Sequence, residues 1–159
     1  MTDKEQLEIY RTQPAVIVKK ILGIELWSKQ IEILESIRNN RYTLVKSGHG
    51  VGKTCSAAAA VLSFLYLHPN SIVITTAPTE RQVKGLLWKE IGRLWKPQHG
   101  GELTDLKLSI RGDEWVALGF TARESVNPEQ MAARIQGYHA ASGHLLVVFD
   151  EAAGVHTAF

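Results

Sequence analysis

Eight consecutive residues carry the clearest chemical pattern of the sequence: Ser47, Gly48, His49, Gly50, Val51, Gly52, Lys53 and Thr54. They lie between a segment with strand propensity and an alanine-rich helix former, which is the context of a phosphate-binding loop. Small residues let successive backbone N–H groups curve around phosphate oxygens, and the following helix directs its positive end at the same anion. Lys53 would contact the β- and γ-phosphates, and the Thr54 hydroxyl would ligate Mg²⁺. The pattern predicts a nucleoside triphosphate site.

The loop departs from the usual pattern at its first position, where Ser47 stands in place of a glycine. Gly48 and Gly50 can supply the flexibility that a leading glycine would give. We expect His49 to contribute its backbone N–H and to have no catalytic role. The alternative is a glycine-rich turn from strand to helix in which the lysine is incidental.

A carboxylate pair, Asp150 and Glu151, follows directly after the wholly apolar segment Leu145–Phe149. A buried strand ending there would deliver Asp150 to the edge of a sheet to hold Mg²⁺, with Glu151 placed to polarise the attacking water. Standing alone, such a pair could merely cap the next helix. Its occurrence together with the loop favours nucleotide hydrolysis, and the adjacent glutamate favours a hydrolytic motor or helicase over a kinase.

Both motifs need strands and helices to position them. The residue types predict a short strand at 42–46 before the loop and a helix over Lys53–Leu67 after it. The β-branched, apolar residues 71–76 predict a buried strand, and Leu145–Phe149 predicts another. This alternation of strands and helices predicts an α/β fold, with a mostly parallel sheet covered on both faces.

Further elements are predicted between and before these strands. Thr79 and Gln82 predict a capping box that opens a helix. Runs 106–110 and 115–120 alternate as in a β-hairpin, and Asn127-Pro128 predicts the start of a short helix. The helix opened by Thr79 is expected to direct its apolar residues to the core: Val83, Leu86, Leu87, Ile91 and Leu94.

The first 40 residues have the spacing of helices. Gly23 is expected to end one helical run, and Ser28 is expected to cap the next. The second helix would place Ile31, Leu34 and Ile37 on one side.

Five segments together resemble the N-terminal ATPase domain of the large subunit of phage terminases, the motor that packages DNA into phage heads. They are Trp27-Ser28-Lys29-Gln30, residues 47–54, 74–82, 133–139 and 147–152. The serine-led loop is a variant found in that family. Segments 77–79 and 150–152 are shared with superfamily 2 helicases, whereas Arg134-Ile135-Gln136-Gly137-Tyr138-His139 favours terminase.

The resemblance implies a fold and a division of the chain. The fold would be a P-loop NTPase of the RecA-like (ASCE) class, a three-layer α/β sandwich with a mostly parallel sheet. Residues 1–40 would form a helical segment with the adenine-side motif, and residues 41–159 the ATPase core. ATP and Mg²⁺ would be the substrate and the metal ion.

The resemblance also gives roles to two side chains outside the loop. Gln30 would read the adenine edge, because an amide offers the donor and acceptor that match adenine N6 and N7; the alternative is a solvated residue at a helix start. Arg134 would meet the γ-phosphate held by a neighbouring subunit, where its fixed charge offsets developing negative charge. Arg81 and Arg123 are rival candidates, and a plain surface arginine is the alternative.

The family implies double-stranded DNA, the portal and the small terminase subunit as partners, a homo-oligomeric ring, and the host cytoplasm as location. The family's nuclease domain is not in this sequence. In motors of this type, the strand after the Asp-Glu segment inserts between the two nucleotide-binding strands. We therefore expect a fragment truncated after the strand that precedes Asp150, with weak ATPase activity. The alternatives are half of a superfamily 2 helicase, or a catalytically silent prophage remnant that acts as a binding module.

Length and composition set the outer bounds. The chain has 159 residues, 45% of them hydrophobic and 21% charged, which predicts one globular domain. A single cysteine, Cys55, excludes a disulfide framework and a cysteine-based zinc cluster. The net charge of +2 is by itself no evidence for nucleic-acid binding. The sequence predicts a soluble intracellular protein, because it shows no signal peptide and no apolar run of about 20 residues.

Overall fold

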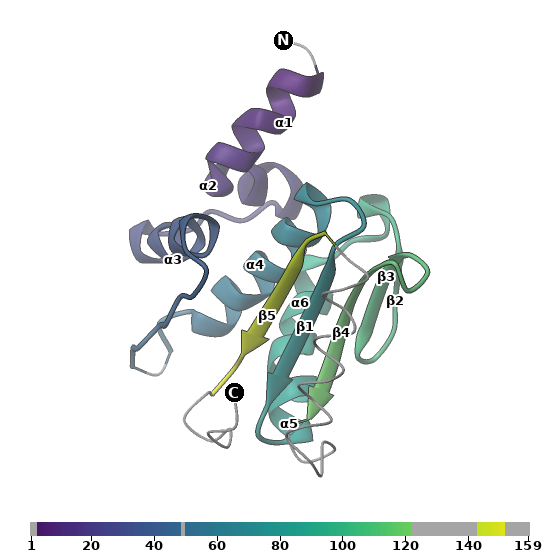
Figure 1. Ribbon diagram of the computed structural model, residues 1–159. Helices are drawn as coiled ribbons and strands as arrows, with labels where there is room; N and C mark the ends of the chain where they lie inside the picture. Colours follow the sequence, from purple (N-terminus) through teal and green to yellow (C-terminus); the bar gives the residue numbers. More distant parts are fainter. Residues whose placement is uncertain (1–2, 49, 122–142, 152–159) are drawn as a thin grey trace.

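One mixed sheet organises the chain in this computed structural model, which describes residues 3–48, 50–121 and 143–151 (Figure 1). Its strands lie in the order β2 (Glu102–Leu103), β3 (Lys107–Arg111), β4 (Trp115–Thr121), β1 (Ile72–Ala77) and β5 (Leu145–Phe149). The central strand β1 pairs in parallel with both β4 and β5. The β2–β3 and β3–β4 pairs are antiparallel, so the α/β class is confirmed but the sheet is mixed, where a mostly parallel one was predicted.

The predicted strands at the centre of the sheet are confirmed. Strand β5 has the predicted bounds, and β1 lies one residue further along the chain than the predicted 71–76. All six residues of β1 are buried, which explains its unbroken β-branched and apolar sequence. The predicted hairpin is formed by β3 and β4, with Gly112 in the turn at φ +58°.

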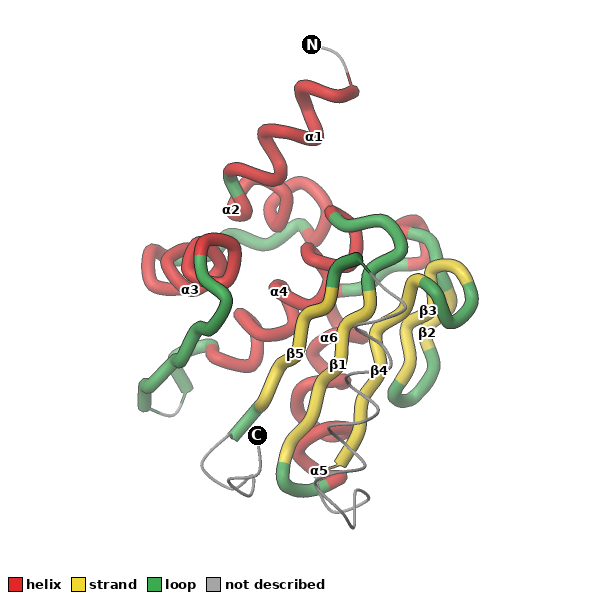
Figure 2. The backbone as a smooth tube through the Cα atoms, in the orientation of Figure 1, coloured by secondary structure: helices red, strands yellow, loops and turns green. Residues whose placement is uncertain are grey.

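The predicted strand at residues 42–46 is wrong. This segment is a loop that runs from α3 (Ser28–Asn39) to α4 (Lys53–Leu67), drawn green in Figure 2. Tyr42 is 80% exposed and Leu44 is 89% exposed. Strand propensity alone does not make a strand, since a ladder also needs a neighbour that supplies N–H and C=O partners. None of the described strands pairs with this segment.

In the described part of the chain, the helices pack on one face of the sheet. That face carries Val73 and Ala77 of β1 in the main core cluster, together with α4 and the helices around it. The opposite face carries the smaller cluster of Ile72, Ile74 and Val116, which contains no residue of a described helix. One helical layer is therefore confirmed, and the described residues show no second layer on the opposite face. No described helix has the length and apolar character needed to cross a membrane.

The helix opened by Thr79 is confirmed at its start and corrected in its middle. The Thr79 hydroxyl accepts from the Gln82 N–H at 3.3 Å, as a capping box requires. The helical run then passes through α5 (Glu80–Gln82), the π-helix η2 (Val83–Trp88) and α6 (Lys89–Leu94). The wider π-turn changes which residues face inward. The core side is formed by Val83, Leu87, Trp88, Ile91 and Leu94, whereas the predicted core residue Leu86 is 50% exposed.

The N-terminal helices are confirmed, with one change at a cap. They are α1 (Asp3–Thr12), α2 (Pro14–Ile17), the π-helix η1 (Val18–Leu22) and α3. Elsewhere in the chain, a short 3₁₀ helix, η3 (Pro97–His99), follows α6. Gly23 ends the first run in the left-handed region at φ +69°, as predicted. Ser28 is not the cap of α3 but its first residue, and the N-cap is Trp27. The predicted helix after Asn127-Pro128 lies outside the described residues.

Candidate functional site

The loop before α4 has the backbone of an anion cradle. Gly50 and Gly52 adopt φ of +74° and +86°, a region that side-chain-bearing residues seldom occupy. Gly52 is the N-cap of α4 and makes no side-chain cap hydrogen bond. Because the first N–H groups of a helix have no acceptor within the helix, they point at whatever lies before it. The residues of the loop thus fit a phosphate group; His49 lies outside the described residues.

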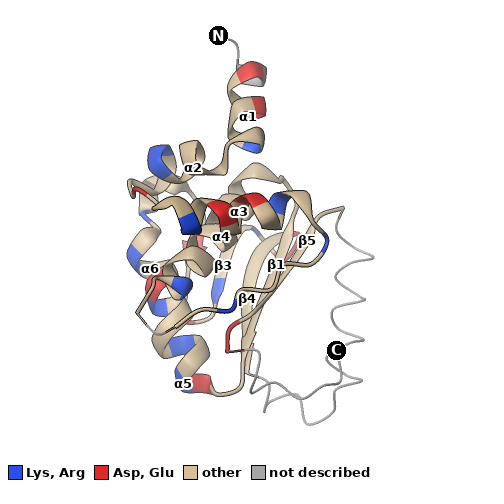
Figure 3. Cartoon of the chain, turned by 90° about the vertical axis from the view of Figure 1, so that its left-hand side faces the viewer, with Lys and Arg blue, Asp and Glu red and all other residues tan. Residues whose placement is uncertain are grey.

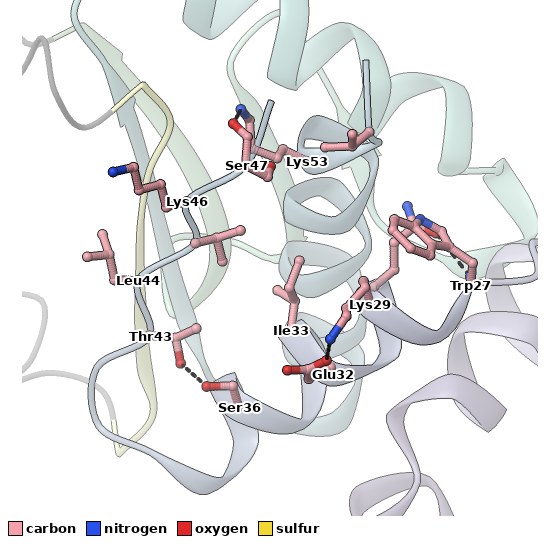
Figure 4. A pocket seen from close by; sticks show the side chains of 13 residues that line it. Trp27, Lys29, Glu32, Ile33, Ser36, Thr43, Leu44, Lys46, Ser47 and Lys53 are labelled. Atoms are coloured by element: carbon pink, nitrogen blue, oxygen red, sulfur yellow. Dashed lines mark hydrogen bonds and ion pairs between the residues drawn. The ribbon is translucent and has the colours of Figure 1, made fainter. Parts of the chain in front are cut away.

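Lys53, the first residue of α4, folds back across this loop. Its Nζ donates to the carbonyl oxygens of Ser47 at 2.9 Å and Gly48 at 3.1 Å. The labelled side chains of Ser47 and Lys53 meet at one end of the view in Figure 4. Thr54 follows as the second residue of α4. The predicted loop residues that the structure describes are therefore gathered at one helix start.

Gln30 reaches this loop from α3, 22 residues away in sequence. Its side-chain Oε1 accepts from the backbone N–H of Trp27 at 3.2 Å, which caps α3. Its Nε2 donates to the carbonyl of Gly52 at 3.3 Å. Gln30 is only 7% exposed, so the alternative of a solvated residue at a helix start is wrong.

Asp150 and Glu151 stand at the end of β5, beside the end of β1. The Asp150 N–H donates to the Thr76 carbonyl at 2.9 Å, which extends the β1–β5 pairing by one bond. Burial and the neighbouring Glu151 carboxylate raise the pKa of Asp150, while the Glu151 N–H and the Lys53 ammonium act in the opposite direction. The charge of Lys53, which is distant in sequence, is therefore one of the influences on the pKa of Asp150. Glu151 is exposed and has a left-handed backbone at φ +52°, uncommon for a residue with a side chain.

A cavity of about 320 Å³ opens beside the loop, between α3 and residues 43–47 (Figure 4). Lys53 and Ser47 border it on the loop side, and Trp27, 52% exposed, borders it at the start of α3. An ion pair of 2.6 Å joins Lys29 and Glu32 on its wall. Its remaining lining residues come from the same elements: Gln30, Ile33, Ser36, Thr43, Leu44, Val45, Lys46 and Val51.

Sequence reasoning did not find this cavity. Ile33 and Ser36 lie three residues apart on α3, away from the predicted stripe of Ile31, Leu34 and Ile37. The apolar residue Ile33, outside that stripe, was the sequence feature that could have indicated a second apolar surface on α3. The predicted strand at 42–46 places Val45 in a sheet, so it gives no sign that Val45 borders a cavity.

Three arginines are the candidates for contact with a neighbouring subunit's γ-phosphate. Arg134 and its rival Arg123 lie outside the described residues, and Arg81 is exposed on α5. Cys55 lies in the first turn of α4. Burial is the main cause that raises the pKa of its thiol, so this cysteine is not activated as a nucleophile.

Basic and acidic residues are mixed on several of the described helices. Each of α3, α5 and α6 carries both lysine or arginine and glutamate (Figure 3). Two basic side chains of the helical run 80–94 form ion pairs, Lys84 with Asp105 and Arg93 with Glu90. The described residues therefore assign no DNA contact.

Comparison with known proteins agrees with the sequence pattern. The chain is 28% identical, over 164 aligned residues, to a protein of Enterobacteria phage P7 named "Probable terminase, large subunit". The chain is similar to a phage terminase large subunit. The alignment covers 96% of the chain but 32% of that protein, so the chain spans about a third of the length of this terminase relative. No family model matches the chain.

Proposed function

We propose that this chain binds and hydrolyses ATP with Mg²⁺, as the motor domain of a DNA-packaging terminase large subunit. One observation carries the proposal. The glycine loop at the start of α4 and the carboxylates after β5 are far apart in the sequence, yet the charge of Lys53 acts on the Asp150 carboxyl, whose pKa burial and Glu151 raise overall. A cation for phosphate and a carboxylate for metal are the two charges that a nucleoside triphosphate site needs side by side.

The loop residues hold the phosphates. Backbone N–H groups between Gly48 and Thr54 surround the anion, and the start of α4 adds its positive dipole. Lys53 turns from the carbonyls of Ser47 and Gly48 toward the phosphate oxygens, exchanging two neutral acceptors for charged ones.

The metal would be held by oxygen ligands from two elements, the Thr54 hydroxyl and the Asp150 carboxylate, in keeping with the preference of Mg²⁺ for oxygen. When bound, Mg²⁺ offsets charge that develops on the phosphate oxygens. The raised pKa of Asp150 reflects a carboxylate that burial leaves under-compensated, which is the state that a nearby cation stabilises.

Glu151 is proposed as the general base. Its exposed carboxylate takes a proton from water as the water oxygen attacks the γ-phosphorus, and the bond to the leaving ADP oxygen breaks. Glu151 has an uncommon left-handed backbone at φ +52°, and strained residues of this kind are concentrated at functional sites.

The partners are proposed from similarity. By its relation to a terminase large subunit, the chain would act on double-stranded DNA with the portal and small subunit, as part of a homo-oligomeric ring in the host cytoplasm. Arg134 is the proposed arginine that reaches the neighbouring subunit's γ-phosphate.

The direct test is calorimetric titration of the chain with ATP in the presence and absence of Mg²⁺. We expect saturable binding that Mg²⁺ strengthens, with a matching rise in melting temperature. Absence of ATP binding at millimolar concentration would contradict the proposal. ATP affinity that does not depend on Mg²⁺ would contradict the proposed role of Thr54 and Asp150 as metal ligands.

A further inference from the structure

We propose that the stacked rings of His68 and His144 form a pH-sensitive joint between the end of α4 and the starts of β1 and β5. The joint is closed when both rings are neutral, and protonation opens the β1–β5 pairing from this end. The proposal does not depend on the nucleotide site, because the joint lies at the opposite end of α4 and β5 from Lys53 and Asp150.

The side chains of the joint come from segments that are far apart in the sequence. The centroid of the His68 ring lies 4.5 Å from that of Phe64 and 4.7 Å from that of His144. Phe64 belongs to the last turn of α4, and His68 is the C-cap of that helix. His144 directly precedes β5. The three rings therefore connect the end of the helix to the start of the strand.

The backbones of the same two histidines hold the start of β1. The Ser71 N–H donates to the His68 carbonyl at 3.1 Å, and the Ile72 N–H donates to the His144 carbonyl at 3.0 Å. Ile72 and Leu145 are the first pair of the β1–β5 register. The bond from Ile72 to His144 therefore lies at the beginning of this pairing. A movement of His144 away from His68 would act on that bond first.

The start of β1 also carries a polar group that gains when this end opens. Ser71 is fully buried, and its Oγ has no hydrogen-bond partner within the described chain. A buried hydroxyl without a partner is unfavourable, and water can satisfy it once the surrounding contacts separate. Opening at this end therefore costs less than opening where all polar groups are paired.

The surroundings of His68 disfavour a positive charge. The residue is half-buried, and burial is the main cause that lowers its pKa, followed by the charges of His144 and Arg11. Of the described groups that act on it from neighbouring elements, none is acidic: His144 precedes β5, Arg11 ends α1, and Phe64 on α4 is neutral. The negative end of the α4 dipole favours a cation here, but the net direction of the pKa is down.

Opening should therefore be linked to proton uptake. When both rings are protonated, two like charges face one another in the stack, and separation of the start of β5 from α4 relieves the repulsion. Because the closed joint binds fewer protons than the open one, opening is least favourable above pH 6.5, the ordinary pKa of histidine, and becomes more favourable as pH falls. One proton taken up raises the opening equilibrium constant by at most about 10-fold per pH unit.

Amide hydrogen exchange of the ligand-free full chain, followed by NMR between pH 7.5 and pH 5, measures this opening. Protection factors are corrected for the intrinsic exchange rate at each pH. The Ile72 N–H reports the joint, and the Gly119 N–H, which donates to the Leu106 carbonyl at 2.8 Å on the far side of β4, reports global unfolding. We expect protection of Ile72 to fall about 3- to 10-fold more than that of Gly119 over this range.

Three variants identify the groups that titrate. His68→Phe keeps a ring in the stack but cannot be protonated, so it should abolish the selective loss of protection at the start of β1. His144→Phe removes the facing charge and leaves His68 to titrate, so the selective loss should become smaller. His99→Gln on η3 is the control, because it keeps an acceptor for the Lys96 N–H and should retain the wild-type pH dependence.

Two outcomes would overturn the proposal. Parallel loss of protection at Ile72 and Gly119 in wild type would mean that pH acts on global unfolding alone, without a joint that opens locally. A selective loss that persists unchanged in His68→Phe and in His144→Phe would assign the opening to other groups. The first comparison uses wild type only, so it decides the matter even if His68→Phe folds poorly.

Discussion

The ammonium of Lys53 donates to the carbonyl of Ser47 at 2.9 Å, across the loop that lies between these two residues. A second bond, to Gly48 at 3.1 Å, keeps the side chain on the same side of the loop. These carbonyls are neutral acceptors, and phosphate oxygens are charged ones. The ammonium gains direct charge–charge attraction when ionised phosphate oxygens replace these carbonyls, so the lysine is expected to change partners when a triphosphate arrives.

Replacing this lysine should therefore strongly weaken nucleotide binding. Lys53→Ala removes a charge-assisted contact of about 1.5–3 kcal/mol, which corresponds to a loss of about 10- to 150-fold in affinity. Calorimetry with ATP and Mg²⁺ measures the loss. Lys89→Ala, an exposed lysine on α6, is the control and should bind as wild type. An unchanged affinity for Lys53→Ala would refute the phosphate-loop assignment.

The two carboxylates after β5 should separate binding from chemistry. Glu151→Gln keeps the size of the side chain and its backbone preference, so ATP affinity should stay while single-turnover hydrolysis slows about 100-fold, the scale of a general base. Asp150→Asn should instead weaken only the Mg²⁺-dependent part of binding. Equal loss of affinity in both variants would make Glu151 a metal ligand or a cap.

A pH dependence of stability is expected at the far end of α4. The ring of His68 lies 4.5 Å from Phe64 and 4.7 Å from His144 between centroids. Burial lowers the pKa of His68 below its ordinary 6.5, and the charges of His144 and Arg11 lower it further. The folded state thus binds fewer protons here than the unfolded state. Its contribution to stability is complete above pH 6.5 and is lost as pH falls through the depressed value.

Thermal unfolding at pH 7.5 and pH 5 tests this expectation. His68→Phe keeps a ring for the stacking contacts and cannot titrate. The melting temperature of the variant should therefore fall less between the two pH values than that of wild type. An equal fall in both proteins would mean that protonation of His68 is not linked to unfolding.

The elements predicted correctly are those whose causes lie close together in sequence. Helix α4 begins where the glycine loop ends and stops before His68-Pro69, and its bounds are the predicted ones. Thr79 and Gln82 cap the next helix by contacts within one turn. The mixed character of the sheet follows from the pairing of β2 with β3 and of β3 with β4, and the prediction had weighted the alternation of strands and helices instead.

The missed features depend on contacts between distant residues. The amide of Gln30 is committed to Gly52, 22 residues away, and nothing near Gln30 in sequence reports that. Leu86 was expected in the core because a helix of 3.6 residues per turn puts it there, and the π-helical turn of η2 carries it outward. Residues 42–46 have the composition of a strand, but pairing is decided by neighbours elsewhere in the chain.

That last difference can be measured. Leu44 borders the cavity but is 89% exposed, so Leu44→Ala should change the free energy of unfolding by less than about 0.5 kcal/mol. Ile74 in β1 is 1% exposed and packs with Ile72 and Val116, so Ile74→Ala should cost about 2–5 kcal/mol. Denaturant unfolding of both variants gives the comparison. If Leu44→Ala costs as much as Ile74→Ala, residues 42–46 are buried in the folded protein. The exposed placement of the loop between α3 and α4 would then be wrong.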